Sequence, residues 1–163
     1  MIILGIDPGI ATTGWGVVEK VEGKRVNGKD FVMLDYGCVL TEPNLSLSER
    51  LELLYSGIQN VLREHKPAAV AVEELFFTNN AKTVMAVGQA RGVILLAAQH
   101  FKVPFFEYTP PEVKSALTGY GRADKSQMQR MIQLILALTE MPKPDDAADA
   151  LAIAYCHGVN MRG

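Results

Sequence analysis

The pattern of apolar and polar residues predicts three β-strands at the start of the chain. Residues 2–7 (IILGID) form a short run of mostly branched apolar residues that a Pro-Gly pair ends, as is typical of a buried strand stopping at a turn. Residues 14–23 and 31–40 are two further strand candidates, and the Gly, Asn and Lys residues between them suit a hairpin. We therefore expect three antiparallel strands, with Asp7 at the C-terminal end of the first.

An amphipathic helix and a buried strand are predicted next. Apolar residues recur at helical spacing from a cap at Ser46 or Ser48 to about His65, and Pro67 closes the helix. Residues 68–74 (AAVAVEE) follow as a nearly all-apolar run, which is the pattern of a central strand covered on both faces. Because this run ends in two acidic residues, a second carboxylate is expected at a strand end.

The rest of the chain is predicted to be mainly helical. A helix is expected from Asn80 to about Phe101, where Ala86, Gly88 and Ala90 form a flat surface of small residues suited to close packing or a dimer contact. The remaining predicted elements are a strand at 104–109, helices at about 111–117 and 128–136 with a mobile, glycine-containing loop at 118–125 between them, and a last helix from near Pro144 to Gly158.

The composition is that of an ordinary globular protein. The chain has 163 residues, of which 48% are hydrophobic and 21% charged, so it can bury a core but is short for two lobes with a cleft between them. Strands followed by mixed strands and helices predict one α/β domain over residues 1–163, with a five-stranded mixed sheet flanked by helices.

Hydropathy, cysteines and charge narrow the class of protein. No apolar run approaches the roughly 18 residues of a membrane span, and the N-terminus lacks the pattern of an export signal, so we expect a cytoplasmic protein that does not bind membranes. Cys38 and Cys156 lack metal-ligand or redox spacing, which favours buried thiols. The net charge of -2 argues mildly against a nucleic-acid partner, but basic residues gather between Pro110 and Gln133.

Carboxylates at strand ends and on the last helix are the main chemical feature of the sequence. Asp7, one of the adjacent Glu73 and Glu74, and the acidic segment 145–149 can converge in an otherwise apolar setting. Converging carboxylates repel one another unless hard cations neutralise them, and a set of oxygen ligands favours Mg²⁺ or Mn²⁺ over Zn²⁺. Two such ions roughly 4 Å apart can hold a phosphate, activate a water and stabilise the leaving oxygen.

The residue pattern alone leaves alternatives open at each of these carboxylates. Asp146 and Asp149 are three apart and share a helix face, but Asp145 and Asp149 are four apart and share one as well. The helix dipole favours acidic residues in a first turn without any metal, and a strand-end aspartate such as Asp7 is commonly a cap or turn residue. A strand buried on both faces offers no alternation by which to choose between its two glutamates.

The chain contains four ordered motifs that span nearly its whole length: GIDPGIATTGWGVV, AVEELFFTNNAKTVMAVGQARG, PPEVKSALTGYGRADKSQMQ and DDAADALAIA. Together they resemble the RuvC family of Holliday junction resolvases. The resemblance implies a ribonuclease H-like fold, a homodimer, and a crossover junction endodeoxyribonuclease of DNA recombination and repair that nicks four-way junctions symmetrically. It also implies two Mg²⁺ ions per subunit, replaceable by Mn²⁺, and the branch-migration proteins RuvA and RuvB as partners.

The same resemblance settles which carboxylates are expected to act. It implies that four of them bind the metal ions and form the catalytic set, and that Asp145 and Glu74 are bystanders. The implied ligands are Asp7, Glu73, Asp146 and Asp149.

The resemblance further implies contacts with DNA. Phe76, in the segment after Glu73, resembles the aromatic residue that inserts at the junction and stacks on a base. Lys114 and Lys125 resemble the basic residues beside the scissile phosphate, where a cation stabilises developing charge, and Lys125 is included in the catalytic set. Arg122 is expected to add affinity for the DNA backbone.

Three other functional classes share part of this pattern. The D-x-G of the first motif also resembles the phosphate loop of actin-like sugar kinases, but those folds have two duplicated lobes and this chain has length for one. A ribonuclease H-like nuclease acting on RNA–DNA hybrids or flaps would use the same carboxylates, and the Phe76 segment and the expected dimer favour junctions over it. A non-catalytic junction-binding protein would have no reason to retain four acidic positions.

Overall fold

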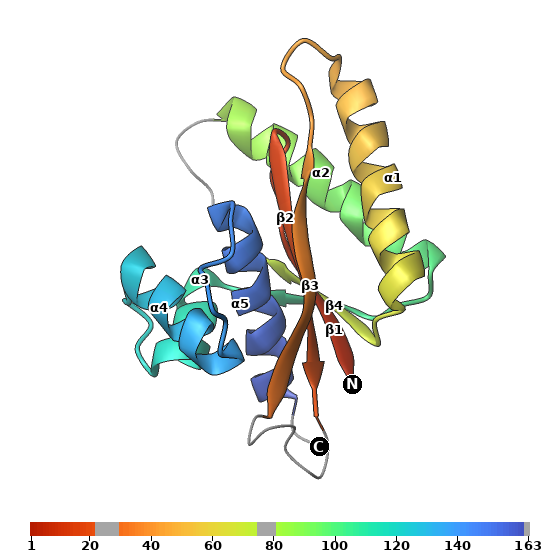
Figure 1. Cartoon of the computed structure of the whole chain (residues 1–163). Helices are drawn as coiled ribbons and strands as arrows, with labels where there is room; N and C mark the ends of the chain where they lie inside the picture. Colours follow the sequence, from red (N-terminus) through yellow and green to blue (C-terminus); the bar gives the residue numbers. More distant parts are fainter. Residues whose placement is uncertain (22–29, 75–80, 162–163) are drawn as a thin grey trace.

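The computed structural model describes residues 1–21, 30–74 and 81–161, which form a five-stranded mixed sheet with helices on both faces (Figure 1). The strand order is β3-β2-β1-β4-β5. β2 pairs antiparallel with β1 and with β3, whereas β4 pairs in parallel with β1 and with β5. The strands are β1 (Ile2–Asp7), β2 (Thr12–Lys20), β3 (Phe31–Leu40), β4 (Ala69–Glu73) and β5 (Phe105–Tyr108). The predicted α/β class and mixed sheet are confirmed.

The opening strands match the prediction except at both ends of β2, which ends at Lys20 and not at the predicted Gly23. β3 spans residues 31–40 as predicted, but β2 begins at Thr12, two residues before the predicted start at Gly14. The reason is pairing rather than hydrophobicity, because Thr12 lies opposite Leu40 at the far end of β3. The hydrophobic pattern along the chain cannot predict a strand residue that is in the strand only because it pairs with a residue of the neighbouring strand.

Helix α1 (Leu47–His65) shows how local sequence sets helix ends. The Ser46 hydroxyl accepts a hydrogen bond from the Glu49 N–H at 3.3 Å, and the Glu49 carboxylate accepts one from the Ser46 N–H at 2.7 Å. This reciprocal cap selects Ser46 over Ser48 as the start. At the other end Lys66 adopts a left-handed conformation with φ of 47°, and Pro67 prevents continuation. The buried stripe consists of Leu54, Ile58, Val61 and Leu62.

Two helical layers enclose the sheet (Figure 1). α1 and α2 cover one face, which buries Leu4 and Ile6 of β1, whereas α5 lies across the other face and buries Ile3. α3 and α4 pack beside α5 and not against the centre of the sheet. The remaining helices are α2 (Ala81–His100), α3 (Pro110–Thr118), α4 (Lys125–Leu136) and α5 (Asp145–Asn160).

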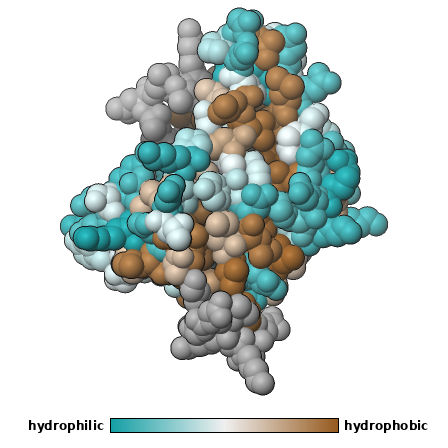
Figure 2. Space-filling view, in the orientation of Figure 1, coloured by the Kyte–Doolittle hydropathy of each residue, from teal (hydrophilic) through white to brown (hydrophobic). Residues whose placement is uncertain are grey.

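The helices present polar residues to solvent. In Figure 2 hydrophilic residues cover the outer sides of α1 and α4, and hydrophobic residues show between them. Each of these two helices buries one apolar stripe, which explains its polar outer side. Within the described ranges, no helix combines the length and the apolarity that crossing a bilayer demands.

Glycines on β1 and β2 allow α5 to lie directly against the sheet backbone. A Cβ atom at Gly5 would collide with the backbone of Ala150, and one at Gly14 would collide with the backbone of Asp146. Gly16 makes the same room further along α5. Because any larger side chain would push the helix outward, these glycines set the height of the first turns of α5 above β1 and β2.

Candidate active site

Asp7 is the last residue of β1 and faces α5. Leu4 and Ile6 point toward α1 and α2, so the alternation of side chains along a strand puts Asp7 on the opposite face. The turn that follows is held by the Thr13 hydroxyl, which donates a hydrogen bond to the Gly9 carbonyl oxygen at 2.5 Å. The Asp7 carboxyl group is therefore fixed beneath the first turns of α5.

Glu73 is the last residue of β4 and is the glutamate that faces the same way. β4 runs parallel to β1 with Val72 opposite Ile6, so the acidic residues that end the two strands are neighbours. Glu74 lies beyond the strand with an exposed side chain, and its N–H donates to the Tyr108 carbonyl oxygen at 2.8 Å. Strand register therefore makes the choice that hydrophobic alternation left open.

The first turns of α5 bring two more carboxyl groups over the strand ends. Asp149 lines a cavity together with Asp7, and the backbone of Asp146 lies against Gly14. Both aspartates are half-buried, whereas Asp145 is exposed. The helix thus directs Asp146 and Asp149, and not Asp145, toward the sheet.

A cavity of about 210 Å³ lies where these elements meet. Its walls include three of the four predicted acidic ligands and both predicted lysines. Asp146 is not among its lining residues, although its charge acts on Asp7. The lining consists of Asp7, Glu73, Asp149, Lys114 and Lys125, completed by Pro110, Val113, Met128, Ala152 and Ile153.

Burial and mutual repulsion raise the pKa of three carboxyl groups in the cavity. The pKa of Asp7 rises to about 7, mainly because of burial and further because of the charges of Glu73 and the two half-buried aspartates of α5. Burial also raises the pKa of Glu73, with Asp149 adding to the shift and Lys114 opposing it. The pKa of Asp149 is raised by burial against the opposing charge of Lys125. These carboxyl groups are fully ionised at neutral pH only at a free-energy cost.

The donor set fits a hard divalent cation. The ligands are all carboxylate oxygens, which Mg²⁺ and Mn²⁺ prefer, and a cation would relieve the repulsion that raises the pKa values. The side chains are not gathered around one point, because no three of these four described carboxyl groups place one oxygen each within 4.8 Å of one another.

Lys125 is held at the cavity by Asp145, an acidic residue outside the predicted ligand set. Its Nζ lies 2.9 Å from Asp145 Oδ2 and 3.9 Å from Asp149 Oδ2. Asp145 also accepts a hydrogen bond from Gln129 Nε2 at 3.0 Å, so it ties the start of α5 to α4. Spacing along the chain carries no signal for this contact, because it joins two different helices.

The other three residues predicted to contact DNA differ in their position relative to the cavity. Lys114 lies on α3 and lines the cavity. Arg122 is exposed between α3 and α4 and does not line it. Phe76 lies outside the described residues, so its predicted role has no structural counterpart here.

Known proteins match almost the whole length of this chain. The family model described as crossover junction endodeoxyribonuclease RuvC matches residues 3–157. The RuvC of Endomicrobium trichonymphae is 54% identical over 157 residues, which are 96% of this chain and 80% of that protein.

Solved structures agree with this match. The Thermus thermophilus RuvC structure has a TM-score of 0.86 at 43% identity, covering 96% of this chain and 93% of that one. The structure of T. thermophilus RuvC in complex with Holliday junction substrate has a TM-score of 0.87 at 40% identity, covering 96% and 92%. These matches confirm the ribonuclease H-like fold and the resemblance seen in the motifs. The chain belongs to the RuvC family of crossover junction endodeoxyribonucleases.

Proposed function

We propose that this protein resolves four-way Holliday junctions in DNA recombination and repair by paired, symmetric nicks. The observation that carries the proposal is the cavity in which Asp7, Glu73 and Asp149 lie with Lys114 and Lys125. Acidic metal ligands beside ammonium groups form a site for a phosphodiester, whose charge needs cations on both sides. The junction as substrate is supported by the likeness to T. thermophilus RuvC in complex with Holliday junction substrate.

The four carboxylates are the proposed metal ligands and the core of the catalytic set. Bound Mg²⁺, expected at about two ions per subunit and replaceable by Mn²⁺, would activate the attacking water and stabilise the leaving oxygen. The β1 and β4 strands fix two ligands from below, and the rigid first turns of α5 fix the other two from above. These ligands are Asp7, Glu73, Asp146 and Asp149.

Basic residues are proposed to act on the phosphate and on the DNA backbone. Lys125 carries its charge beside Asp149, where it would stabilise the negative charge that develops on the phosphate, so we place it in the catalytic set. Lys114 lines the same cavity from α3, and the exposed Arg122 would add backbone affinity. Phe76 is proposed to stack on a base at the junction, which contributes about 1–3 kcal/mol per base.

A homodimer is proposed as the active form, because symmetric nicks need two sites related by symmetry. The outer side of α2 supports this, since Met85, Leu95 and Leu96 are exposed there. RuvA and RuvB are the proposed partners in the cytoplasm, on the basis of family membership.

Substrate choice is tested with purified protein and Mg²⁺ on a synthetic four-way junction, a linear duplex and an RNA–DNA hybrid. We expect symmetric nicks in the junction alone. Cleavage of the hybrid at an equal or higher rate would favour the alternative of a ribonuclease H-like nuclease and overturn the proposal.

The ligand set is tested by neutral substitutions of two proposed ligands and of the glutamate next to one of them. Asp7→Asn and Glu73→Gln should each lower the rate of junction cleavage at least about a hundredfold, because each removes the charge of a ligand that would hold the metal ion against the phosphate. Glu74→Gln is the matched control, since its side chain is exposed outside the cavity, and it should cleave at the wild-type rate. Gel-shift assays should show unchanged junction binding for all three, and full cleavage by Asp7→Asn would refute the assignment.

A further inference from the structure

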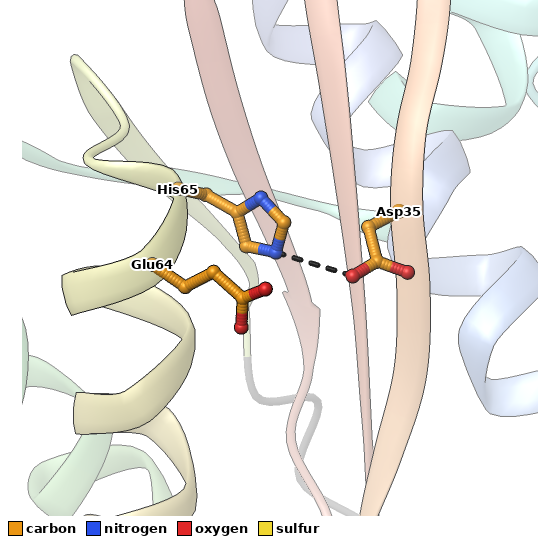
Figure 3. Close-up of side chains that lie close together, drawn as sticks. All are labelled: Asp35, Glu64 and His65. Atoms are coloured by element: carbon orange, nitrogen blue, oxygen red, sulfur yellow. Dashed lines mark ion pairs between the residues drawn. The ribbon is translucent and has the colours of Figure 1, made fainter.

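A second group of metal-ligating side chains lies on the opposite face of the sheet from the cavity. It consists of Asp35 on β3 and of Glu64 and His65 in the last turn of α1. One ligand atom from each residue lies within 4.8 Å of the other two, and Figure 3 shows the three side chains directed toward one another. Among the described residues, this is the group that meets this three-ligand distance.

The register of the edge strand aims Asp35 at α1. Asp35 lies opposite Val17, which packs in the core beneath α1 and α2, so both side chains point to that face. The β2–β3 register shifts between Val17 and Val18, which is where the edge strand bends. Asp35 Oδ1 accepts a hydrogen bond from the Tyr36 N–H at 2.8 Å, and this fixes the carboxylate with Oδ2 toward α1.

His65 is held with its ring nitrogen toward Asp35. Its side chain is only 14% exposed, and its ring packs against Trp15 with centroids 6.1 Å apart. Nε2 lies 3.2 Å from Asp35 Oδ2. The last turn of a helix carries the negative end of its dipole, so a cation is favoured at this position.

We propose that Asp35, Glu64 and His65 form a binding site for a divalent transition-metal ion, with Zn²⁺ as the best fit. One imidazole nitrogen with two carboxylate oxygens is a ligand set that Zn²⁺ accepts at four-coordination, with water in the fourth position. The nitrogen ligand separates this site from the all-oxygen cluster around Asp7, which selects Mg²⁺ or Mn²⁺. A bound ion would link the end of α1 to the edge strand β3.

The alternative explanation of the same geometry is an ion pair between His65 and Asp35, in which Glu64 lies nearby but takes no part. The two explanations differ in what Glu64 does. An ion pair needs only two partners, whereas a metal site needs all three ligands and competes with protons for the imidazole. Substitution of Glu64 therefore separates them.

Zn²⁺ binding is measured by isothermal titration calorimetry with Mg²⁺ in excess, using an Asp7→Asn/Asp149→Asn protein so that the catalytic carboxylates do not take the ion. We expect one Zn²⁺ per chain. Added His65→Gln, Asp35→Asn or Glu64→Gln should each weaken binding at least about tenfold, because loss even of a group that only supports a ligand costs that much. Glu52→Gln, an exposed carboxylate on the same helix, is the matched control and should bind like the parent.

Two further readouts keep the test decisive. Co²⁺ in place of Zn²⁺ should give visible absorption bands that His65→Gln removes, which shows nitrogen ligation directly. Zn²⁺ should also raise the thermal unfolding midpoint of the parent protein more than that of Glu64→Gln at the same Zn²⁺ concentration. The proposal fails if Zn²⁺ does not saturate the parent, or if Glu64→Gln binds Zn²⁺ as the parent does.

Discussion

The two faces of the sheet hold their acidic residues under opposite conditions. On the α5 face, Asp7 is buried among other carboxyl groups, and its pKa rises to about 7. On the α1 face, Asp35 is 46% exposed and lies beside His65. The first arrangement is destabilised by its own charges and is relieved by cations, whereas in the second a partly exposed carboxylate pairs with an imidazole ring. Crowding of the carboxyl groups, more than their number, therefore distinguishes the face that carries the proposed active site.

Glycine substitutions are expected to give the largest difference in stability between the two faces of the sheet. Gly14→Ala should destabilise the protein by about 3 kcal/mol, because the new Cβ meets the backbone of Asp146, which cannot move without α5. Gly57→Ala is the counterpart on the other face, where the new Cβ meets the Val39 side chain and a smaller loss is expected. Urea unfolding measures both, and equal losses would show that α5 is not held tightly.

Crowding at Asp7 should appear as a dependence of stability on pH. Because its folded pKa is above its unfolded value of 3.8, the unfolded state loses its proton first, and stability falls as pH rises from about 4 to about 7. Asp7→Asn should remove this fall and be more stable than wild type at pH 8 without metal, by about 2 kcal/mol after allowance for screening.

Addition of Mg²⁺ provides a control for the pH dependence of wild type and Asp7→Asn. Added Mg²⁺ should stabilise wild type more than Asp7→Asn, because the variant lacks one of the proposed ionised ligands. Denaturant unfolding at several pH values gives both results. A wild-type protein that is more stable than Asp7→Asn at pH 8 without metal would show that Asp7 is not crowded.

The ion pair at the cavity rim is expected to give a moderate kinetic effect. Lys125→Ala should slow the chemical step by about tenfold to a hundredfold, because it removes the charge proposed to stabilise the transition state. Asp145→Asn should slow it less, since it leaves the lysine in place but unpaired from its partner at 2.9 Å. Single-turnover cleavage of a junction measures both, and an Asp145→Asn rate as low as that of Lys125→Ala would make the pair inseparable in function.

The smallest effect is expected on the α1 face. Asp35→Asn without added metal should lower stability by no more than about 1 kcal/mol, because the pair with His65 is partly exposed. The loss should shrink at high salt, which screens exposed pairs. A loss as large as that from Gly14→Ala would contradict the view that this face is held by packing rather than by charge.

Local sequence was sufficient for most of the secondary structure. The capping box at Ser46 and the proline after α1 act over a few residues, so the helix could be located without knowledge of its surroundings. The β3 range was also predicted correctly, because a strand bounded by turn residues carries its own signal. The start of β2 at Thr12 was not, since it depends on pairing with Leu40.

The sequence by itself determined which motifs are present, and with them the RuvC family and the candidate ligands at the strand ends and on α5. The family resemblance already favoured Glu73 over Glu74, and the tertiary structure supplies the reason, because of these two residues only Glu73 lines the cavity. Only the tertiary structure decided that Asp145 holds Lys125 and that Asp35 meets His65. The physical reason is that motifs and caps arise from neighbours along the chain. Side-chain direction, burial and charge pairing arise from strands and helices that meet only after folding.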